Sequence, residues 1–155
     1  MDRQDCIFCR IVAGRLPAYR IYEDRRYVAI LDIFPNTRGQ TLVLPKRHMV
    51  SLFSDISDGE LSQFVLVSKK VANLLRRKLG VARVHMVLEG LGANHLHAKL
   101  YPANGLTSSR FRQILAPETA YFKRYPGYVS TVLGPRASDA SLRRLQKQIT
   151  GRVGA

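Results

Sequence analysis

The alternation of apolar and polar positions predicts several short strands in the first third of the chain. Residues 6–13 carry apolar side chains at near-helical spacing and predict a short helix, which the glycine and proline that follow end. Two alternating runs, residues 19–23 and 27–34, predict an antiparallel hairpin. After a segment rich in turn formers, the apolar run at 41–45 predicts a third strand.

A long helix is predicted over residues 57–79. Ser57 and Glu60 have the Ser-x-x-Glu spacing of a capping box, in which both side chains bind backbone amides at the start of a helix. Gly80 is placed to end this helix. The apolar stripe of the segment consists of Leu61, Phe64, Val65, Val71, Ala72, Leu75 and Leu79. The helix is therefore predicted to bury one face and to expose a basic one.

Residues 81–88 and 94–102 predict two further strands, which are consecutive and therefore form a hairpin. Successive side chains of a strand point to opposite faces. One face of the second strand carries His95, His97, Lys99 and Tyr101, and the other carries Leu96, Ala98 and Leu100. The apolar set can pack in a core, and the polar set is available for chemistry.

The last third of the chain is less regular. Residues 128–133 predict a strand, and an amphipathic helix is predicted to begin at Ser138. Aromatic and basic residues at 121–128 either line the phosphate side of a site, contact a nucleic acid, or pack on the sheet. The whole pattern predicts an α+β domain, with a mostly antiparallel sheet of about five strands and the long helix on one face. Residues 1–102 form its core, and residues 103–155 a C-terminal strand–helix extension of the same domain.

Composition and charge narrow the class of protein. A chain of 155 residues, 46% of them hydrophobic, suits one compact domain. No apolar run reaches the roughly 18 residues that span a bilayer, and the first five residues are too polar for a signal peptide, so we expect a soluble cytoplasmic protein with no membrane partner. The net charge of +14 favours polyanionic partners, either nucleotides or nucleic acid, although a well-solvated basic surface explains it equally well.

Cys6 and Cys9 have the Cys-x-x-Cys spacing of two ligands on a tetrahedral zinc ion. A closed structural site needs two more ligands, and the chain offers four histidines for them: His48, His85, His95 and His97. The alternative is that both cysteines are small buried hydrophobic residues. Spacing alone does not decide between these interpretations.

The His-x-His pair at residues 95 and 97 has three interpretations. It can be half of a metal site, a coincidence on the surface, or a nucleophile beside a residue that orients it. A neutral imidazole is a competent nucleophile toward phosphorus, and the Lys99 ammonium two residues on would stabilise negative charge on phosphoryl oxygens.

Four segments resemble the histidine triad (HIT) superfamily of nucleotide hydrolases and transferases, in the family's order. Residues 95–101 look like its His-x-His-x-His-x-x signature, with lysine at the third histidine. Residues 6–11 look like its opening segment, and residues 31–35 and 39–48 look like its central hairpin. Together the four segments lie within the first two thirds of the chain.

The resemblance implies a reaction and its residues. His97 matches the nucleophile that attacks an α-phosphorus and forms a nucleotidyl-histidine intermediate, and Lys99 sits where the third histidine contacts phosphate. Asp32 matches the acid that binds the ribose hydroxyls. The positions that sandwich a purine are Ile7, Phe8, Ile11, Ile30 and Ile33, and Asn94 is a further candidate on the phosphate side. The zinc ligands implied by the family are Cys6, Cys9, His48 and His95.

The function expected from the resemblance is a nucleotide hydrolase or nucleotidyl transferase. Its substrates would be dinucleoside polyphosphates, nucleoside phosphoramidates or related adenylylated compounds, with structural zinc and with magnesium arriving on the substrate. A homodimer is expected because many relatives dimerise. The alternative is a non-catalytic basic module, held together by zinc, that binds nucleotides or RNA. Gln40 stands where many members of the family have histidine. His85 matches no functional position and is interpreted as a satisfied structural histidine.

Overall fold

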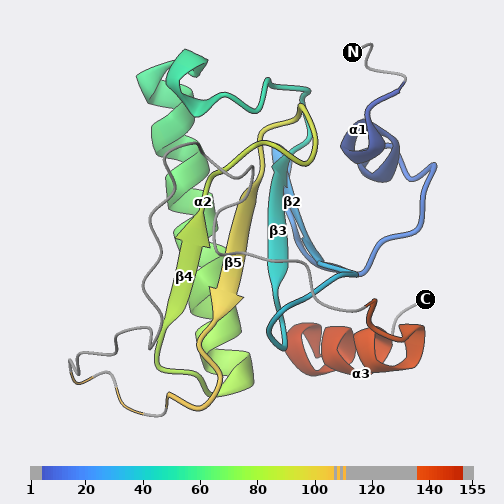
Figure 1. The fold of residues 1–155 in the computed structure, drawn as a ribbon, viewed down its shortest axis with the longest axis vertical. Helices are drawn as coiled ribbons and strands as arrows, with labels where there is room; N and C mark the ends of the chain where they lie inside the picture. The colour runs from blue at the N-terminus through green and yellow to red at the C-terminus, as the bar shows by residue number, and fades with distance from the viewer. Residues whose placement is uncertain (1–4, 107, 109, 111–135, 152–155) are drawn as a thin grey trace, which may run out of the picture.

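The computed structural model describes residues 5–106, 108, 110 and 136–151, and these form an α+β fold (Figure 1). The elements, in chain order, are α1 (Ile7–Val12), β1 (Arg20–Glu23), β2 (Tyr27–Leu31), β3 (Thr41–Pro45), a 3-10 turn (Phe53–Asp55), α2 (Asp58–Leu79), β4 (Val84–Val87), β5 (Ala98–Pro102) and α3 (Asp139–Thr150). The strands form one sheet in the order β1-β2-β3-β5-β4, and every neighbouring pair is antiparallel. The expected five-stranded sheet and its two hairpins are confirmed.

The two faces of the sheet carry different layers. Leu96, Ala98 and Leu100 belong to the larger core, which is formed with α2 and α3. Leu42 and Leu44 on β3 belong to a smaller core on the other side, formed with α1, whereas Val43 between them belongs to the larger one. Alternation along the strands therefore sorts the layers as predicted, and each fully buried leucine contributes about 2 kcal/mol.

Helix α2 begins and ends where the sequence predicts, but two details differ. Val65 is exposed, and Val67 is buried in its place, because the buried residues follow the spacing of one helical face from Phe64. The expected capping box does not form: the Ser57 hydroxyl donates to the Glu60 carboxylate at 3.0 Å and caps no backbone amide. The Glu60 carboxylate also forms an ion pair with Arg47.

Three predicted strands are shorter than expected. Strand β2 ends at Leu31 because the Asp32 carboxylate accepts the backbone N–H of Phe34 and turns the chain. Strand β4 covers only Val84–Val87. Strand β5 begins at Ala98, so His95 and His97 precede it; the Leu96 N–H donates to the Met49 carbonyl instead of to a neighbouring strand.

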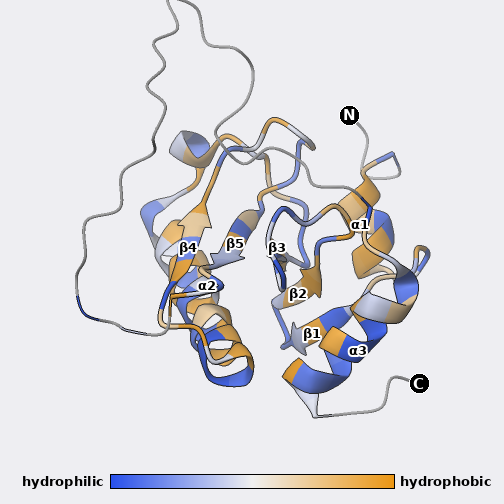
Figure 2. Cartoon of the chain, turned by 60° about the horizontal axis from the view of Figure 1, so that its bottom comes forward, coloured by the Kyte–Doolittle hydropathy of each residue, from blue (hydrophilic) through white to orange (hydrophobic). Residues whose placement is uncertain are grey.

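The C-terminal helix is confirmed and completes the larger core. Ser138 caps α3 by accepting the Ser141 N–H, and the buried side chains of α3 are Leu142, Leu145 and Ile149. Figure 2 shows α3 beside β1, where Gln146 donates to the Arg20 carbonyl at 2.8 Å. The strand expected at 128–133 and the aromatic segment at 121–128 lie outside the described residues. None of the described helices combines the length and the apolar character needed to cross a membrane.

Candidate functional site

Four side chains from distant parts of the sequence meet at the end of the sheet. The Nδ1 atom of His95 lies 3.4 Å from the Cys6 sulfur and 3.6 Å from the Cys9 sulfur, and the Nδ1 atom of His48 lies 3.3 Å from the Cys9 sulfur. The four ligand atoms all lie within 4.8 Å of one another. Tetrahedral zinc with S and N ligands places neighbouring ligand atoms about 3.5 Å apart. The donor set and its spacing therefore fit zinc.

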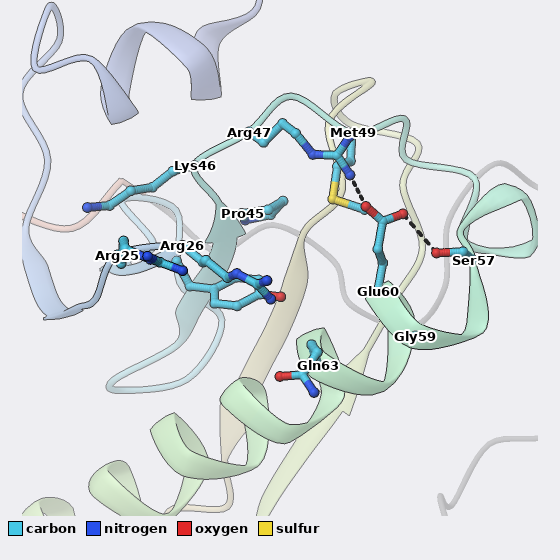
Figure 3. A pocket seen from close by; sticks show the side chains of 11 residues that line it. Arg25, Arg26, Pro45, Lys46, Arg47, Met49, Ser57, Gly59, Glu60 and Gln63 are labelled. Atoms are coloured by element: carbon cyan, nitrogen blue, oxygen red, sulfur yellow. Dashed lines mark hydrogen bonds and ion pairs between the residues drawn. The ribbon is translucent and has the colours of Figure 1, made fainter.

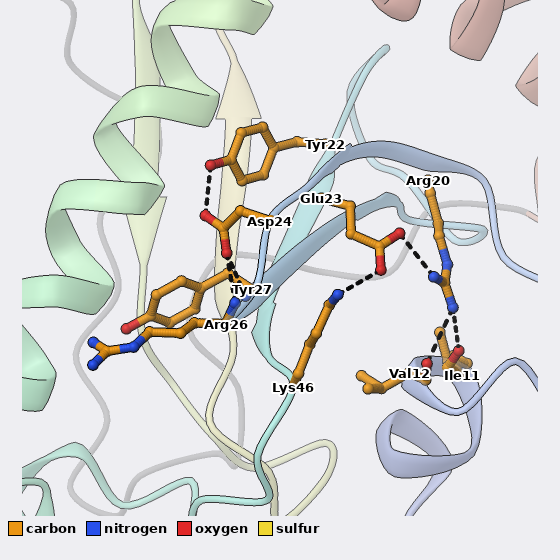
Figure 4. Close-up of polar contacts among 9 residues, drawn as sticks. All are labelled: Ile11, Val12, Arg20, Tyr22, Glu23, Asp24, Arg26, Tyr27 and Lys46. Carbon is orange, nitrogen blue, oxygen red and sulfur yellow. Dashed lines mark hydrogen bonds and ion pairs between the residues drawn. The ribbon is translucent and has the colours of Figure 1, made fainter.

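The local structure explains why these four residues converge. Cys6 is the N-cap residue of α1 and Cys9 lies within the helix, so their three-residue spacing puts both sulfurs on one side of the helix. His48 follows β3 and His95 precedes β5, and these two strands are neighbours in the sheet. Polar contacts connect the sheet to α1 (Figure 4). Arg20 on β1 donates to the carbonyls of Ile11 and Val12 in α1 and forms a salt bridge with Glu23. Glu23 in turn forms a salt bridge with Lys46 after β3.

His95 is fully buried, and its ring is oriented by a backbone carbonyl. Its Nε2 atom lies 3.0 Å from the Pro45 oxygen. A carbonyl only accepts, so Nε2 carries the proton and the lone pair of Nδ1 points at the two sulfurs. Burial lowers the pKa of His95 to about 4, so the ring is neutral at pH 7. A neutral imidazole with an outward Nδ1 lone pair is the form that binds a metal.

His97 is buried as well, but its ring is the opposite tautomer, with the proton on Nδ1 instead of Nε2. Its Nδ1 atom lies 2.7 Å from the His95 carbonyl oxygen and must donate to it. Nε2 is therefore the unprotonated nitrogen, which is the atom a nucleophile needs. Burial lowers the pKa of His97, which keeps the ring neutral at pH 7. The Phe8 ring packs against the imidazole with ring centroids 5.2 Å apart.

Lys99 is held by an acid that the sequence did not single out. The Lys99 ammonium lies 2.6 Å from Glu89 Oε1, which itself lies 3.9 Å from His97 Nε2, and the Glu89 side chain is only 8% exposed. Burial raises the pKa of Glu89, but the hydrogen bond and charge of Lys99 outweigh it, so the net shift is downward and the group is ionised at pH 7. Glu89 could have been found only from the register of the two strands. Strand β4 pairs Val87 with Lys99, and continuing this antiparallel register by two residues places Glu89 opposite His97.

Asp32 is buried and held by two donors. Gln40 Nε2 donates to Oδ2 at 2.6 Å, and the Phe34 N–H donates to Oδ1 at 2.9 Å. The Gln40 side-chain carbonyl accepts the Asn36 N–H, which fixes the orientation of the amide. Gln40, a departure from the family pattern, therefore orients the acid expected to bind ribose. Each carboxylate oxygen retains capacity for a further donor.

The apolar residues expected around a base separate into two groups. Ile11 and Ile30 are buried in the smaller core, whereas Ile7 and Ile33 are 50% and 39% exposed. Phe8 is half-buried against the two histidine rings. Of these five residues, therefore, Ile7, Phe8 and Ile33 are the ones with accessible apolar surface.

Asn94 and His85 make up the remaining candidates, and they lie in different surroundings. The Asn94 side-chain oxygen accepts hydrogen bonds from the backbone and hydroxyl of Ser51, which holds the loop before His95 in place. His85 is exposed on β4 at the edge of the sheet. His85 was interpreted as a satisfied structural histidine, and its exposure shows that it is not part of the packed core.

The fold and the site together define an α+β protein with two buried histidines, one of which belongs to a Cys₂His₂ cluster. Residues 13–102 match the HIT domain family. An uncharacterized HIT-like protein of Mycobacterium tuberculosis is 47% identical over 107 residues, covering 64% of this chain and 73% of that relative. One from Methanocaldococcus jannaschii is 39% identical over 102 residues, covering 63% and 78%. A zinc-bound histidine triad family protein of Mycobacterium smegmatis is similar in structure, with TM-score 0.63, 27% identity and coverage of 97% and 96%. The chain belongs to the HIT domain family.

Proposed function

We propose that this protein is a nucleotide hydrolase or nucleotidyl transferase that acts at an α-phosphate through His97. The observation that carries the proposal is the orientation of the His97 ring. Its Nδ1 proton is committed to the His95 carbonyl, so a neutral, unprotonated Nε2 faces the charged pair of Lys99 and Glu89. Family membership supports the same reaction class.

The reaction proceeds in two displacements. His97 Nε2 attacks the α-phosphorus; an N–P bond forms, and the bond to the leaving group breaks with its electron pair, which takes up a proton from solvent where the leaving group is an amine or alcohol. Water or another acceptor then attacks the same phosphorus and releases its proton to solvent, and the N–P electron pair returns to Nε2. Lys99 stabilises negative charge on the phosphoryl oxygens, and Asp32 accepts the ribose hydroxyls of a purine nucleotide. Magnesium would arrive with the substrate phosphates, since the described residues contain no carboxylate cluster to hold it.

Zinc is the metal that suits Cys6, Cys9, His48 and His95, and the similar histidine triad family protein of Mycobacterium smegmatis is zinc-bound. When bound here, zinc would cross-link α1 to the segments after β3 and before β5 as a structural ion, since four protein ligands leave no open position. The thiol ligands would stay reduced in the cytoplasm, where we propose the protein works. We also propose a homodimer, because β4 lies at the sheet edge and exposes Met86.

The test is a screen of adenylylated and guanylylated substrates with the wild type, His97→Ala and the matched control His85→Ala. We expect turnover by the wild type and the control, loss of turnover in His97→Ala, and a mass increase of one nucleotidyl group on the peptide that contains His97 after acid-free quenching. Full turnover by His97→Ala would disprove the covalent mechanism.

A second candidate function is binding of a polyanion, such as RNA, without catalysis. A cleft of about 730 Å³ between the β1–β2 turn and the start of α2 is lined by four basic residues, Arg25, Arg26, Lys46 and Arg47 (Figure 3). Lys46 is paired with Glu23, and Arg47 is paired with Glu60. The positive charge of two of the four basic residues is therefore already neutralised by an acid. Steeply salt-dependent binding to oligonucleotides with no turnover of any nucleotide would favour this function.

A further inference from the structure

The pair formed by Glu89 and Lys99 changes the charge of the candidate site. Lys99 is a permanent cation whose side chain is 14% exposed, and a buried charge is costly unless it is paired. Glu89 supplies the partner at 2.6 Å. The pair as a whole is neutral, so Lys99 brings no net positive charge to the site.

The Glu89 carboxylate also faces the reacting atom. Its Oε1 lies 3.9 Å from His97 Nε2, while its Oε2 lies 3.4 Å from the backbone nitrogen of Leu91 in its own loop. One oxygen is therefore turned toward the loop and the other toward Lys99 and His97. In an in-line attack by His97 Nε2 the leaving group lies on the far side of the phosphorus, at a distance from Nε2 comparable to the 3.9 Å that separates Nε2 from this second oxygen.

The loop that carries Glu89 is held against another segment of the chain. Gly90 has φ of +67°, and a Cβ there would lie 2.7 Å from the Ser51 carbonyl oxygen, so the two backbones are in close contact. Asn94, at the other end of the loop, accepts hydrogen bonds from Ser51. The same residue, Ser51, thus holds both ends of the loop, which fixes Glu89 beside the histidine.

A fixed carboxylate next to the attacking atom discriminates between leaving groups. A polyphosphate leaving group brings further negative oxygens toward Glu89, and the neutral pair of Glu89 and Lys99 has no net positive charge to offset their repulsion by the carboxylate. An amine or hydroxyl leaving group brings N–H or O–H donors, which a carboxylate accepts. Lys99 stays available to the non-bridging oxygens of the single phosphate that is transferred.

We infer that Glu89 is a specificity-determining residue, which selects nucleotidyl compounds whose leaving group is an uncharged amine or alcohol and rejects polyphosphate leaving groups. This inference rests on the proposed function and narrows its substrate class. The inference predicts a change in the ratio of two activities. A variant that is merely destabilised would lower both activities and leave their ratio unchanged.

The experiment compares two substrates that share the same nucleoside monophosphate: a phosphoramidate with an alkylamine leaving group and a dinucleoside polyphosphate. We measure kcat/KM for both with the wild type, Glu89→Gln, Glu89→Asp and the exposed-acid control Asp55→Asn. The wild type, Glu89→Asp and Asp55→Asn are expected to prefer the phosphoramidate. Glu89→Gln is expected to shift the ratio at least tenfold toward the polyphosphate.

Each outcome decides between specific alternatives. Equal losses on both substrates in Glu89→Gln would show that the residue is structural and would overturn the inference, while leaving the proposed function intact. A preference of the wild type for the polyphosphate would also overturn the inference. This outcome needs no variant, so it can be observed even if Glu89→Gln does not fold. A wild type that turns over neither substrate, nor any other in the screen, would overturn the proposed function and the inference with it.

Discussion

His95 and His97 lie two residues apart and are both buried, yet they offer opposite ring nitrogens to their surroundings. His95 donates from Nε2 to the Pro45 carbonyl and turns Nδ1 to the cysteines. His97 donates from Nδ1 to the His95 carbonyl and turns Nε2 to Glu89 and Lys99. In each case a backbone carbonyl selects the tautomer, and the tautomer decides whether the ring suits a metal or a phosphorus atom.

This difference depends on the irregular backbone before β5. Because the strand begins only at Ala98, the His95 carbonyl is placed to accept from the His97 ring. The metal cluster and the nucleophile are thereby joined: the residue that would bind zinc also orients the ring that would attack. Separate perturbation of the two rings is the way to test this division of roles.

The largest expected effect is on turnover, from His97→Ala. Loss of the attacking atom should lower turnover by at least about 10³-fold, since removal of a nucleophile eliminates the covalent route. The variant should keep its bound metal, because His97 is not one of the four ligands. Steady-state assays and metal analysis check both points, and loss of metal together with activity would show that the two roles are not separate.

The substitution Cys6→Ser changes the metal cluster and leaves His97 in place. Its main expected effect is a lower free energy of unfolding. Cys6 is 3% exposed, and its thiolate would be replaced by a hydroxyl that binds zinc poorly. We expect loss of the metal and of about 3 kcal/mol or more, which lowers Tm by about 10 °C for a domain of this size. Metal analysis and scanning calorimetry measure this, with His85→Ala as a control that retains the metal. Well under one zinc per chain in wild type purified without chelator would contradict the four-ligand site.

The parts of this arrangement that follow local rules could be predicted from the sequence. Alternation identified the strands and assigned Leu96, Ala98 and Leu100 to the core, because period-2 patterns report directly on the two faces of a sheet. The spacing of Cys6 and Cys9 together with the family pattern also indicated the four residues that the structure brings together in one cluster.

The parts that depend on long-range contacts were not predicted. Glu89 lies in a loop with no motif, and its position opposite His97 follows only from the pairing of β4 with β5. The role of Gln40 depends on Asp32, eight residues earlier, which turns back toward it after β2 ends. The expected capping box at Ser57 does not form either: Glu60 bonds to the Ser57 hydroxyl and to Arg47, which comes from a distant segment.

An intermediate effect is expected on the pH dependence of stability, through Glu89. Its pKa lies below the ordinary value of 4.5, because Lys99 outweighs burial, so its contribution to stability is present above about pH 4.5 and is lost as the pH falls through the folded-state pKa. At pH 7, Glu89→Gln should cost about 1–3 kcal/mol.

The measurement is the free energy of unfolding by guanidinium for the wild type and Glu89→Gln between pH 7 and 3. The difference between the two chains should shrink below about pH 4.5. Titration of His97 and of the metal ligands occurs in both chains and largely cancels in the comparison. A difference that stays constant with pH would show that Glu89 has the same pKa in the folded and unfolded protein, so that Lys99 does not stabilise its charge.

The smallest expected effect concerns how Asp32 is held, and it is tested by Gln40→Met. Methionine keeps the volume of the side chain but removes the 2.6 Å hydrogen bond to Asp32 and the acceptor for Asn36. The carboxylate becomes less well oriented, and loss of about 1 kcal/mol of ribose binding should raise KM about fivefold. Because the His97 ring is oriented by a different carbonyl, kcat should change less than twofold. The exposed glutamine variant Gln63→Met controls for loss of an amide, and a drop in kcat as large as the rise in KM would mean that Asp32 and His97 are coupled rather than independent.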